Sequence, residues 1–147
     1  MEGRPSGRDA FSVVRYPVGD FSLARAEKLA HKLQDPLWLV AVRAAESKQA
    51  KHIRVLDLRE ITSFADYFVI CSGANTRQIQ AICEEIGQEL KKRGELPHSL
   101  EGYNHAEWVL ADYGDFVIHV FSEKARTYYD LERLWRDAKT VEWAAQV

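Results

Sequence analysis

The segment from residue 107 to residue 121 predicts a two-stranded antiparallel hairpin. Two runs rich in apolar and β-branched residues flank a short polar stretch with a glycine, which is typical of a tight turn between strands. With Tyr113 and Gly114 as the two-residue loop, Trp108 is expected to lie opposite His119. This pairing separates the side chains of the hairpin onto two faces of different character.

One face of the hairpin is wholly apolar and is expected to be core. The other face is too apolar for plain solvent and too polar for a sealed interior, which is typical of a surface that meets a partner. The alternative is that Trp108, Leu110 and Phe121 lie under a helix and that His119 is satisfied by a nearby carboxylate. The mixed face comprises Trp108, Leu110, Asp112, Asp115, Val117, His119 and Phe121.

Length and charge narrow the class of protein. At 147 residues the chain is long enough for one domain with its own core. Its formal net charge of −2 disfavours direct binding of DNA or bare RNA. No apolar run approaches the roughly 18 residues of a membrane span, and the amino terminus lacks the layout of a secretory signal. We therefore expect a cytoplasmic protein without membrane association, with an organelle as the alternative location.

The predicted elements follow the order helix, strand, strand, helix, strand, strand, helix. This order indicates an α/β (α+β) domain with a mixed sheet of four to five strands flanked by helices. Three helices can cover one face of such a sheet but hardly both, so the mixed face is expected to stay available. We expect an N-terminal extension over residues 1–35, partly disordered or with a short helix over 21–33, the domain over 36–143 and a tail over 144–147. The last helix is expected over residues 123–138, with its inward face formed by Tyr128, Leu131, Trp135 and Ala138.

Possible catalytic sites are weakly supported. The stretch from Ser72 to Arg77 lies between a strand and a helix, but it lacks the glycines and the Lys-Ser/Thr pair of a phosphate-binding loop. Asp112 and Asp115 could hold Mg²⁺ or do acid/base work, although carboxylates at a turn are more often turn formers. The five histidines show no metal-ligand spacing. The alternative function is a nucleotide-binding enzyme that uses the Ser72 to Arg77 corner with Asp66 and Asp112.

From about Leu37 to Trp143 the chain resembles the ribosomal silencing factor family, also called Iojap-like proteins. Several blocks in the same order carry the resemblance, which makes it specific. The blocks are residues 55–58, 66–73 with Arg77 and Gln78, Glu101 with Gly102, 108–112, 114–121 and 126–135.

The resemblance implies an α/β fold related to nucleotidyltransferases but without their activity, so no enzyme, cofactor or metal is expected. It also implies binding to the large ribosomal subunit through its protein fourteen, which blocks joining of the small subunit and represses translation. Organellar relatives act in assembly of the large subunit. The sequence agrees on the missing chemistry, because Ser72-Gly73 reverses the nucleotidyltransferase Gly-Ser element and no acidic pair follows it. This role is also compatible with a homodimer that the free chain forms through the same hairpin.

Carried onto this chain, the resemblance places the partner surface on the mixed face of the hairpin. Four residues are expected to anchor the partner, and four carboxylates are expected to form an acidic rim that suits a basic ribosomal protein. The anchors are Trp108, Leu110, His119 and Phe121, and the rim is Glu101, Glu107, Asp112 and Asp115.

Overall fold

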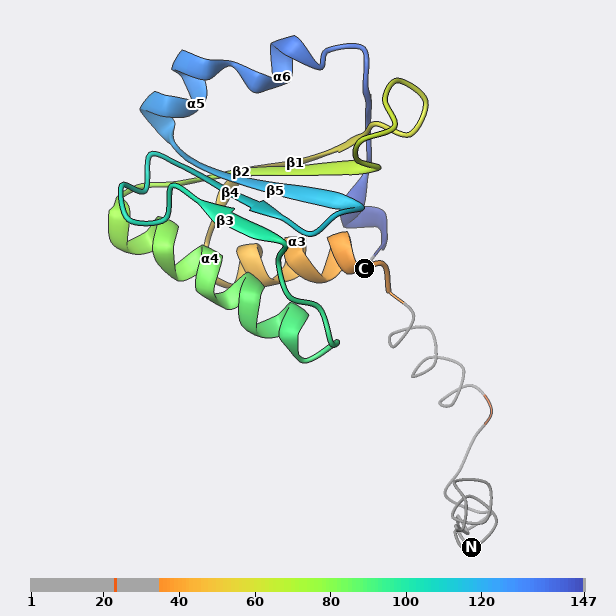
Figure 1. The fold of residues 1–147 in the computed structure, drawn as a ribbon, viewed down its shortest axis with the longest axis horizontal. Helices are drawn as coiled ribbons and strands as arrows, with labels where there is room; N and C mark the ends of the chain where they lie inside the picture. Colours follow the sequence, from red (N-terminus) through yellow and green to blue (C-terminus); the bar gives the residue numbers. More distant parts are fainter. Residues whose placement is uncertain (1–22, 24–34, 147) are drawn as a thin grey trace, which may run out of the picture. The chain divides into compact units, whose positions relative to one another are not determined.

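Six strands form one mixed sheet in the order β3-β4-β5-β2-β1-β6 (Figure 1). The two central strands, β2 and β5, pair in parallel, and the other neighbours are antiparallel. The predicted α/β class is confirmed, while the short strands β3 and β6 raise the strand count above the four to five expected. The strands are β1 (Lys51–Asp57), β2 (Tyr67–Gly73), β3 (Ser99–Glu101), β4 (Trp108–Asp112), β5 (Phe116–Ser122) and β6 (Lys139–Thr140).

The computed structural model describes residue 23 and residues 35–146. The chain divides into two units, Met1–Asp35 and Pro36–Val147, and the sheet belongs to the second. The helix expected over residues 21–33 lies outside the described residues apart from Leu23. Within the described part of the chain, no helix has the length and apolar character needed to cross a membrane.

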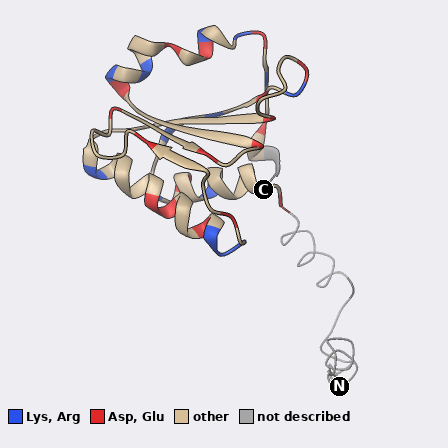
Figure 2. Cartoon of the chain, in the orientation of Figure 1, with Lys and Arg blue, Asp and Glu red and all other residues tan. Residues whose placement is uncertain are grey.

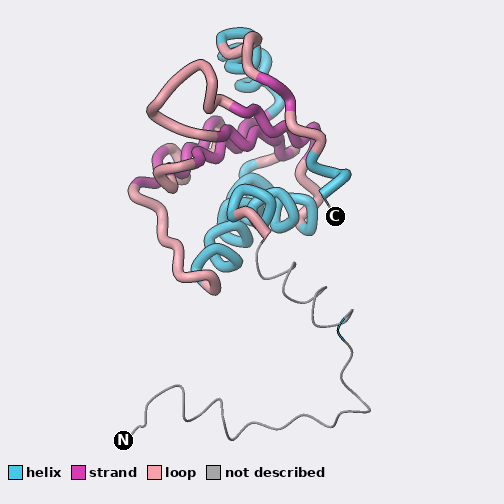
Figure 3. The backbone as a smooth tube through the Cα atoms, turned by 90° about the vertical axis from the view of Figure 1, so that its right-hand side faces the viewer, coloured by secondary structure: helices cyan, strands magenta, loops and turns pink. Residues whose placement is uncertain are grey.

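Helices lie on both faces of the sheet, which Figure 3 shows between two helical layers. The α4 face carries α3 (Leu37–Ser47) and α4 (Thr76–Lys91), and the α5 face carries α5 (Glu123–Tyr129) and α6 (Leu131–Leu134). A short 3-10 helix, η2 (Trp143–Gln146), ends the described chain. Each face has its own apolar cluster. The expectation that helices cover one face alone is therefore wrong.

Helix α4 begins at a side-chain cap and ends at a glycine. The Asn75 side chain accepts the backbone N–H of Gln78 at 2.8 Å, and the Gln78 side chain accepts the N–H of the residue before Asn75. At the other end Gly94 has a φ of +83°, and the N–H of Glu95 donates to the carbonyl of Leu90 at 2.9 Å. Each end thus has backbone groups paired by a cap, which fixes where the amphipathic helix begins and ends.

The hairpin of β4 and β5 has a register two residues away from the predicted one. Trp108 lies opposite Phe121 rather than His119. The loop is Gly114 and Asp115, because Gly114 with a φ of +89° occupies the first loop position, where a hairpin turn needs a positive φ. A shift of two residues keeps every strand side chain on its own face. The residues of β4 and β5 that were assigned to the mixed face therefore do lie on one face, although the predicted pairing is wrong.

The helix predicted over residues 123–138 is instead two short helices with a break between them. Asp130 adopts the left-handed conformation, with φ 47° and ψ 51°, and ends α5 before α6 begins. Tyr128, which was expected to face inward, is therefore 79% exposed. Leu131 and Trp135 still pack on the apolar cluster of the α5 face, as expected.

Gly87 lies inside α4, and a Cβ added there would meet nothing within 4 Å. Gly87→Ala is expected to raise the free energy of unfolding by roughly 0.5–1 kcal/mol, because alanine loses less backbone entropy in a helix. Urea unfolding followed by circular dichroism measures the change. The matched control is Gly102→Ala, which should destabilise, because Gly102 has a φ of +80° and an added Cβ would overlap the Trp108 carbonyl oxygen. A less stable Gly87→Ala chain would contradict the packing described for α4.

Candidate partner-binding site

Five aromatic rings meet on the α5 face, where α5 approaches strands β4 and β5. The Trp108 ring lies 5.1 Å from the Phe121 ring and 4.7 Å from the Tyr129 ring, measured between centroids. The His119 ring lies 4.5 Å from the Phe68 ring in a T-shaped arrangement. These five residues are called the Trp108 cluster below. They come from β2, β4, β5 and α5, so the cluster joins the sheet to its covering helix.

A hydrogen bond inside the cluster fixes the state of the imidazole. Trp108 Nε1–H donates to His119 Nδ1 at 3.0 Å. A neutral imidazole that accepts through Nδ1 carries its proton on Nε2. Burial lowers the pKa of His119 to about 3, so the ring is neutral at physiological pH. His119 therefore acts here as an acceptor inside the protein.

The cluster is only partly accessible to a partner. Trp108 and Leu110 are half-buried, whereas His119 is 3% exposed and Phe121 is 0% exposed. The expected availability of the whole mixed face is thus wrong for His119 and Phe121. Their strand, β5, lies between β2 and β4, so Phe68 and Trp108 shield them from its two sides. The accessible part of the face is the β3–β4 end, centred on Trp108 and Leu110.

The four expected rim carboxylates have different surroundings. Glu101 is exposed and lies opposite Leu110 across the β3–β4 pair, next to the accessible apolar residues. Glu107 is exposed and accepts the hydroxyl that caps α5 at 2.8 Å. Asp112 is half-buried and accepts a backbone N–H of the hairpin turn, and Asp115 is exposed in the loop itself. Asp112 is thus a turn former as well as a candidate rim residue. In the fold as a whole, the strands are mostly uncharged, and charges concentrate on helices and loops (Figure 2).

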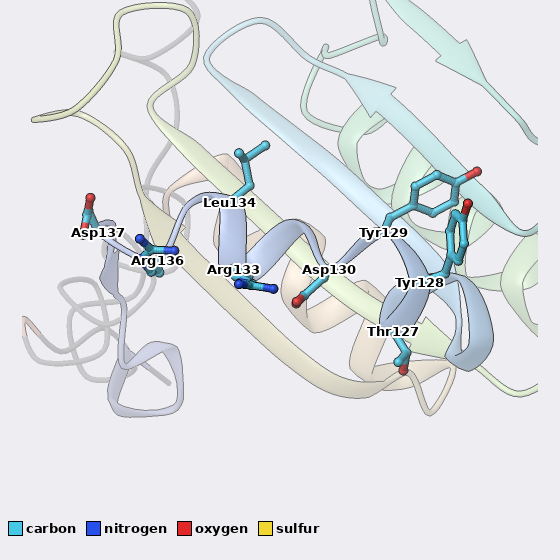
Figure 4. A pocket seen from close by; sticks show the side chains of 8 residues that line it. All are labelled: Thr127, Tyr128, Tyr129, Asp130, Arg133, Leu134, Arg136 and Asp137. Carbon is cyan, nitrogen blue, oxygen red and sulfur yellow. The ribbon is translucent and has the colours of Figure 1, made fainter.

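An open groove of about 720 Å³ on α5 and α6 was not predicted from the sequence (Figure 4). Tyr128 and Tyr129 meet there in a T-shaped contact, with centroids 5.0 Å apart, and Leu134 and Arg133 also line it. Because Tyr129 also contacts Trp108, the groove continues the accessible end of the cluster. A signal was present in Asp130, since aspartate tolerates the left-handed conformation that ends a helix and exposes the preceding tyrosines.

An ion-pair network holds α5 and α6 against the sheet. Glu132 of α6 accepts from Arg126 at 2.9 Å and from Arg54 of β1 at 2.9 Å. Arg126 also donates to the hydroxyl of Ser72 in β2 at 2.8 Å, and Arg54 donates to Thr140 in β6 at 2.8 Å. The network therefore ties both helices to three strands, and it supports the helix that carries Tyr129.

The residues of the alternative enzymatic site are not brought together. Asp66 precedes β2 and its N–H donates to the Asp115 carbonyl at 2.6 Å, which places it at the hairpin-turn end of the sheet near Asp112. Ser72 lies at the far end of β2, roughly 20 Å away at about 3.3 Å per residue. Its side chain is buried and engaged by Arg126. Within residues 35–146, no group of three or more His, Cys, Asp or Glu side chains is placed to hold a metal ion.

A family model described as "Ribosomal silencing factor during starvation" matches residues 31–146. The chain belongs to the ribosomal silencing factor family. It is 45% identical over 103 residues to the ribosomal silencing factor of Halalkalibacterium halodurans, which covers 70% of this chain and 88% of that protein. These findings confirm the family that the sequence blocks indicated.

Solved and more distant relatives agree with this membership. A crystal structure from Bacillus halodurans matches with a TM-score of 0.65 and 42% identity, covering 72% of this chain and 96% of that one. The mouse protein named mitochondrial assembly of ribosomal large subunit protein 1 is 32% identical over 97 residues, covering 64% of this chain and 42% of that protein. The crystal structure shows the same fold. Ribosome silencing is the role for which the family is named.

Replacing Glu132 by glutamine tests the ion-pair network. Hydrogen bonding from Arg126, and less strongly from Arg54, lowers the pKa of Glu132 in the folded chain below its ordinary value of 4.5, although desolvation opposes the shift. The folded state thus favours the charged form, and this stabilisation is present above pH 4.5 and lost as pH falls through the folded pKa. Glu132→Gln should therefore lower the free energy of unfolding by about 1–2 kcal/mol at pH 7.

Urea unfolding between pH 3 and pH 8 measures this effect. The difference between wild type and Glu132→Gln should be constant above about pH 6 and shrink below pH 4.5. The matched control is Glu60→Gln, because Glu60 forms an exposed pair with Lys139 at 3.0 Å and should matter little. Equal effects of the two substitutions at pH 7 would contradict the role given to the network.

Proposed function

We propose that this protein binds the large ribosomal subunit through its protein fourteen and thereby blocks joining of the small subunit, which represses translation. One observation carries the proposal: Trp108 and Leu110 are half-buried apolar side chains at one end of the sheet, and exposed carboxylates border them. Membership of the ribosomal silencing factor family supports the ribosome as the target. The name of the mouse relative supports the large subunit, and it also supports a role in large-subunit biogenesis.

The chemistry of the accessible end suits a basic protein partner. Tryptophan and tyrosine are the side chains that most often dominate binding energy at interfaces, and Trp108 and Tyr129 are in contact here. Glu101 lies beside Leu110, so an apolar contact would have a carboxylate at its margin. Ribosomal proteins are usually basic, and a negative rim steers such a partner while it repels RNA phosphates.

The proposed mechanism needs occupancy of a site and no turnover. A bound protein that covers a surface needed by the small subunit prevents joining for as long as it stays bound. The fraction of large subunits silenced then depends on the protein concentration relative to the Kd. We place this action in the cytoplasm, where a ribosomal partner would be met. The free chain could use the same surface to pair with a second copy, which light scattering would detect.

Truncation of Trp108 tests the assigned surface. Trp108→Ala should weaken binding to purified large subunits at least about 30-fold, because truncating a central interface tryptophan costs about 2 kcal/mol or more. Co-sedimentation at several protein concentrations measures the change. The matched control is Leu96→Ala, which removes an exposed apolar side chain in the connection after α4 and should leave binding unchanged. Normal binding by a folded Trp108→Ala chain would rule out this surface.

Competition between subunits tests the steric mechanism separately. With large subunits saturated by the protein, formation of joined ribosomes should fall, and excess small subunits should displace the protein. Sucrose-gradient sedimentation distinguishes free subunits, joined ribosomes and bound protein. A stable particle that contains both subunits and the protein would eliminate the steric block while leaving large-subunit binding intact.

A further inference from the structure

We infer that His119 is a positioning residue that turns the Trp108 indole so that its carbon edge, rather than its N–H group, faces the partner. The inference rests on the proposed function for the identity of the partner, and on the geometry of the Trp108 cluster for everything else. It changes the expected role of His119 from a contact residue to a buried support.

Ring contacts alone do not decide which edge of the indole points outward. Trp108 is stacked on Phe121 with an interplanar angle of 27°, and Tyr129 lies against it at 48°. These contacts fix the plane of the ring. If the indole were flipped over by a half-turn, its two edges would exchange places and much of the apolar contact would remain. The hydrogen bond from Nε1 to His119 Nδ1, at 3.0 Å, selects the orientation with N–H inward.

A histidine at position 119 carries a free-energy cost that its packing does not explain. Its Nε2 is buried and has no hydrogen-bond partner among the described residues. The T-shaped contact with Phe68, with centroids 4.5 Å apart, offers a weak N–H attraction to a ring at most. An apolar side chain at position 119 would avoid this unsatisfied donor. The benefit that offsets the cost is the Nδ1 acceptor, which burial keeps unprotonated.

The orientation defines what the partner can recognise at Trp108. Since the sole polar atom of the indole is already paired inside the protein, the accessible part of the ring offers carbon and no hydrogen-bond donor. The fitting group on the partner is therefore hydrocarbon, such as the aliphatic stem of a lysine or arginine whose charge can reach the carboxylate of Glu101. A hydrogen-bond acceptor on the partner would find no free indole N–H at this position.

Two substitutions at position 119 separate positioning from simple packing. His119→Asn places an amide oxygen close to where Nδ1 lies, so it keeps an acceptor for the indole. His119→Leu keeps apolar volume and removes the acceptor. Full-length chains labelled with ¹⁵N give an indole signal for each tryptophan, and the Trp108 signal is assigned by its absence in Trp108→Phe. The readouts are hydrogen exchange of that indole N–H and affinity for purified large subunits.

We expect slow indole exchange in wild type, exchange within about threefold of wild type in His119→Asn, and exchange at least tenfold faster in His119→Leu. Affinity should follow the same order, with a loss of about tenfold in His119→Leu, the equivalent of one net hydrogen bond. Fast exchange in wild type, or equal exchange in both variants, would overturn the positioning role. Faster exchange in His119→Leu with unchanged affinity would also overturn it, whereas wild type that fails to sediment with large subunits would overturn the proposed function instead.

Discussion

The hydrogen bond between Trp108 and His119 determines what the domain presents at the accessible end of its sheet. It joins a half-buried indole to a buried imidazole, so the surface residue takes its orientation from the interior. The neutral imidazole depends on burial, and burial depends on neighbouring strands and on Phe68. A surface property of this protein is therefore set by the packing of its α5 face.

Two features of the fold make that packing possible. The parallel pairing of β2 with β5 places Ile70 beside His119, and it brings Phe68 of β2 within ring contact of the imidazole. The break at Asp130 then lets α6 turn back, so that Glu132 reaches both Arg126 and Arg54. Tyr129 is the last residue of α5, directly before that break, and it contacts Trp108. The site thus combines a rigid sheet with a helix pinned by ion pairs.

The sequence predicted the faces of the hairpin better than its register. Alternation places Trp108 and His119 on the same side whether the loop begins at Tyr113 or at Gly114, because the two registers differ by two residues. The caps of α4 were also predictable, since they involve groups within a few residues of each other. Burial of His119 was left open by the sequence, because it depends on pairing with β2, a parallel strand that is distant in sequence. The strands β3 and β6 are too short to produce a periodic pattern.

Hydrogen–deuterium exchange of the full chain, free and bound to purified large ribosomal subunits, tests the central claim most directly. If the accessible end of the α5 face meets the ribosome, amide exchange should slow in peptides that cover β3, β4 and the end of α5. Peptides that cover α3 and α4, on the opposite face, should exchange as they do in the free chain. Slowing confined to α3 and α4, with β4 unchanged, would contradict the claim.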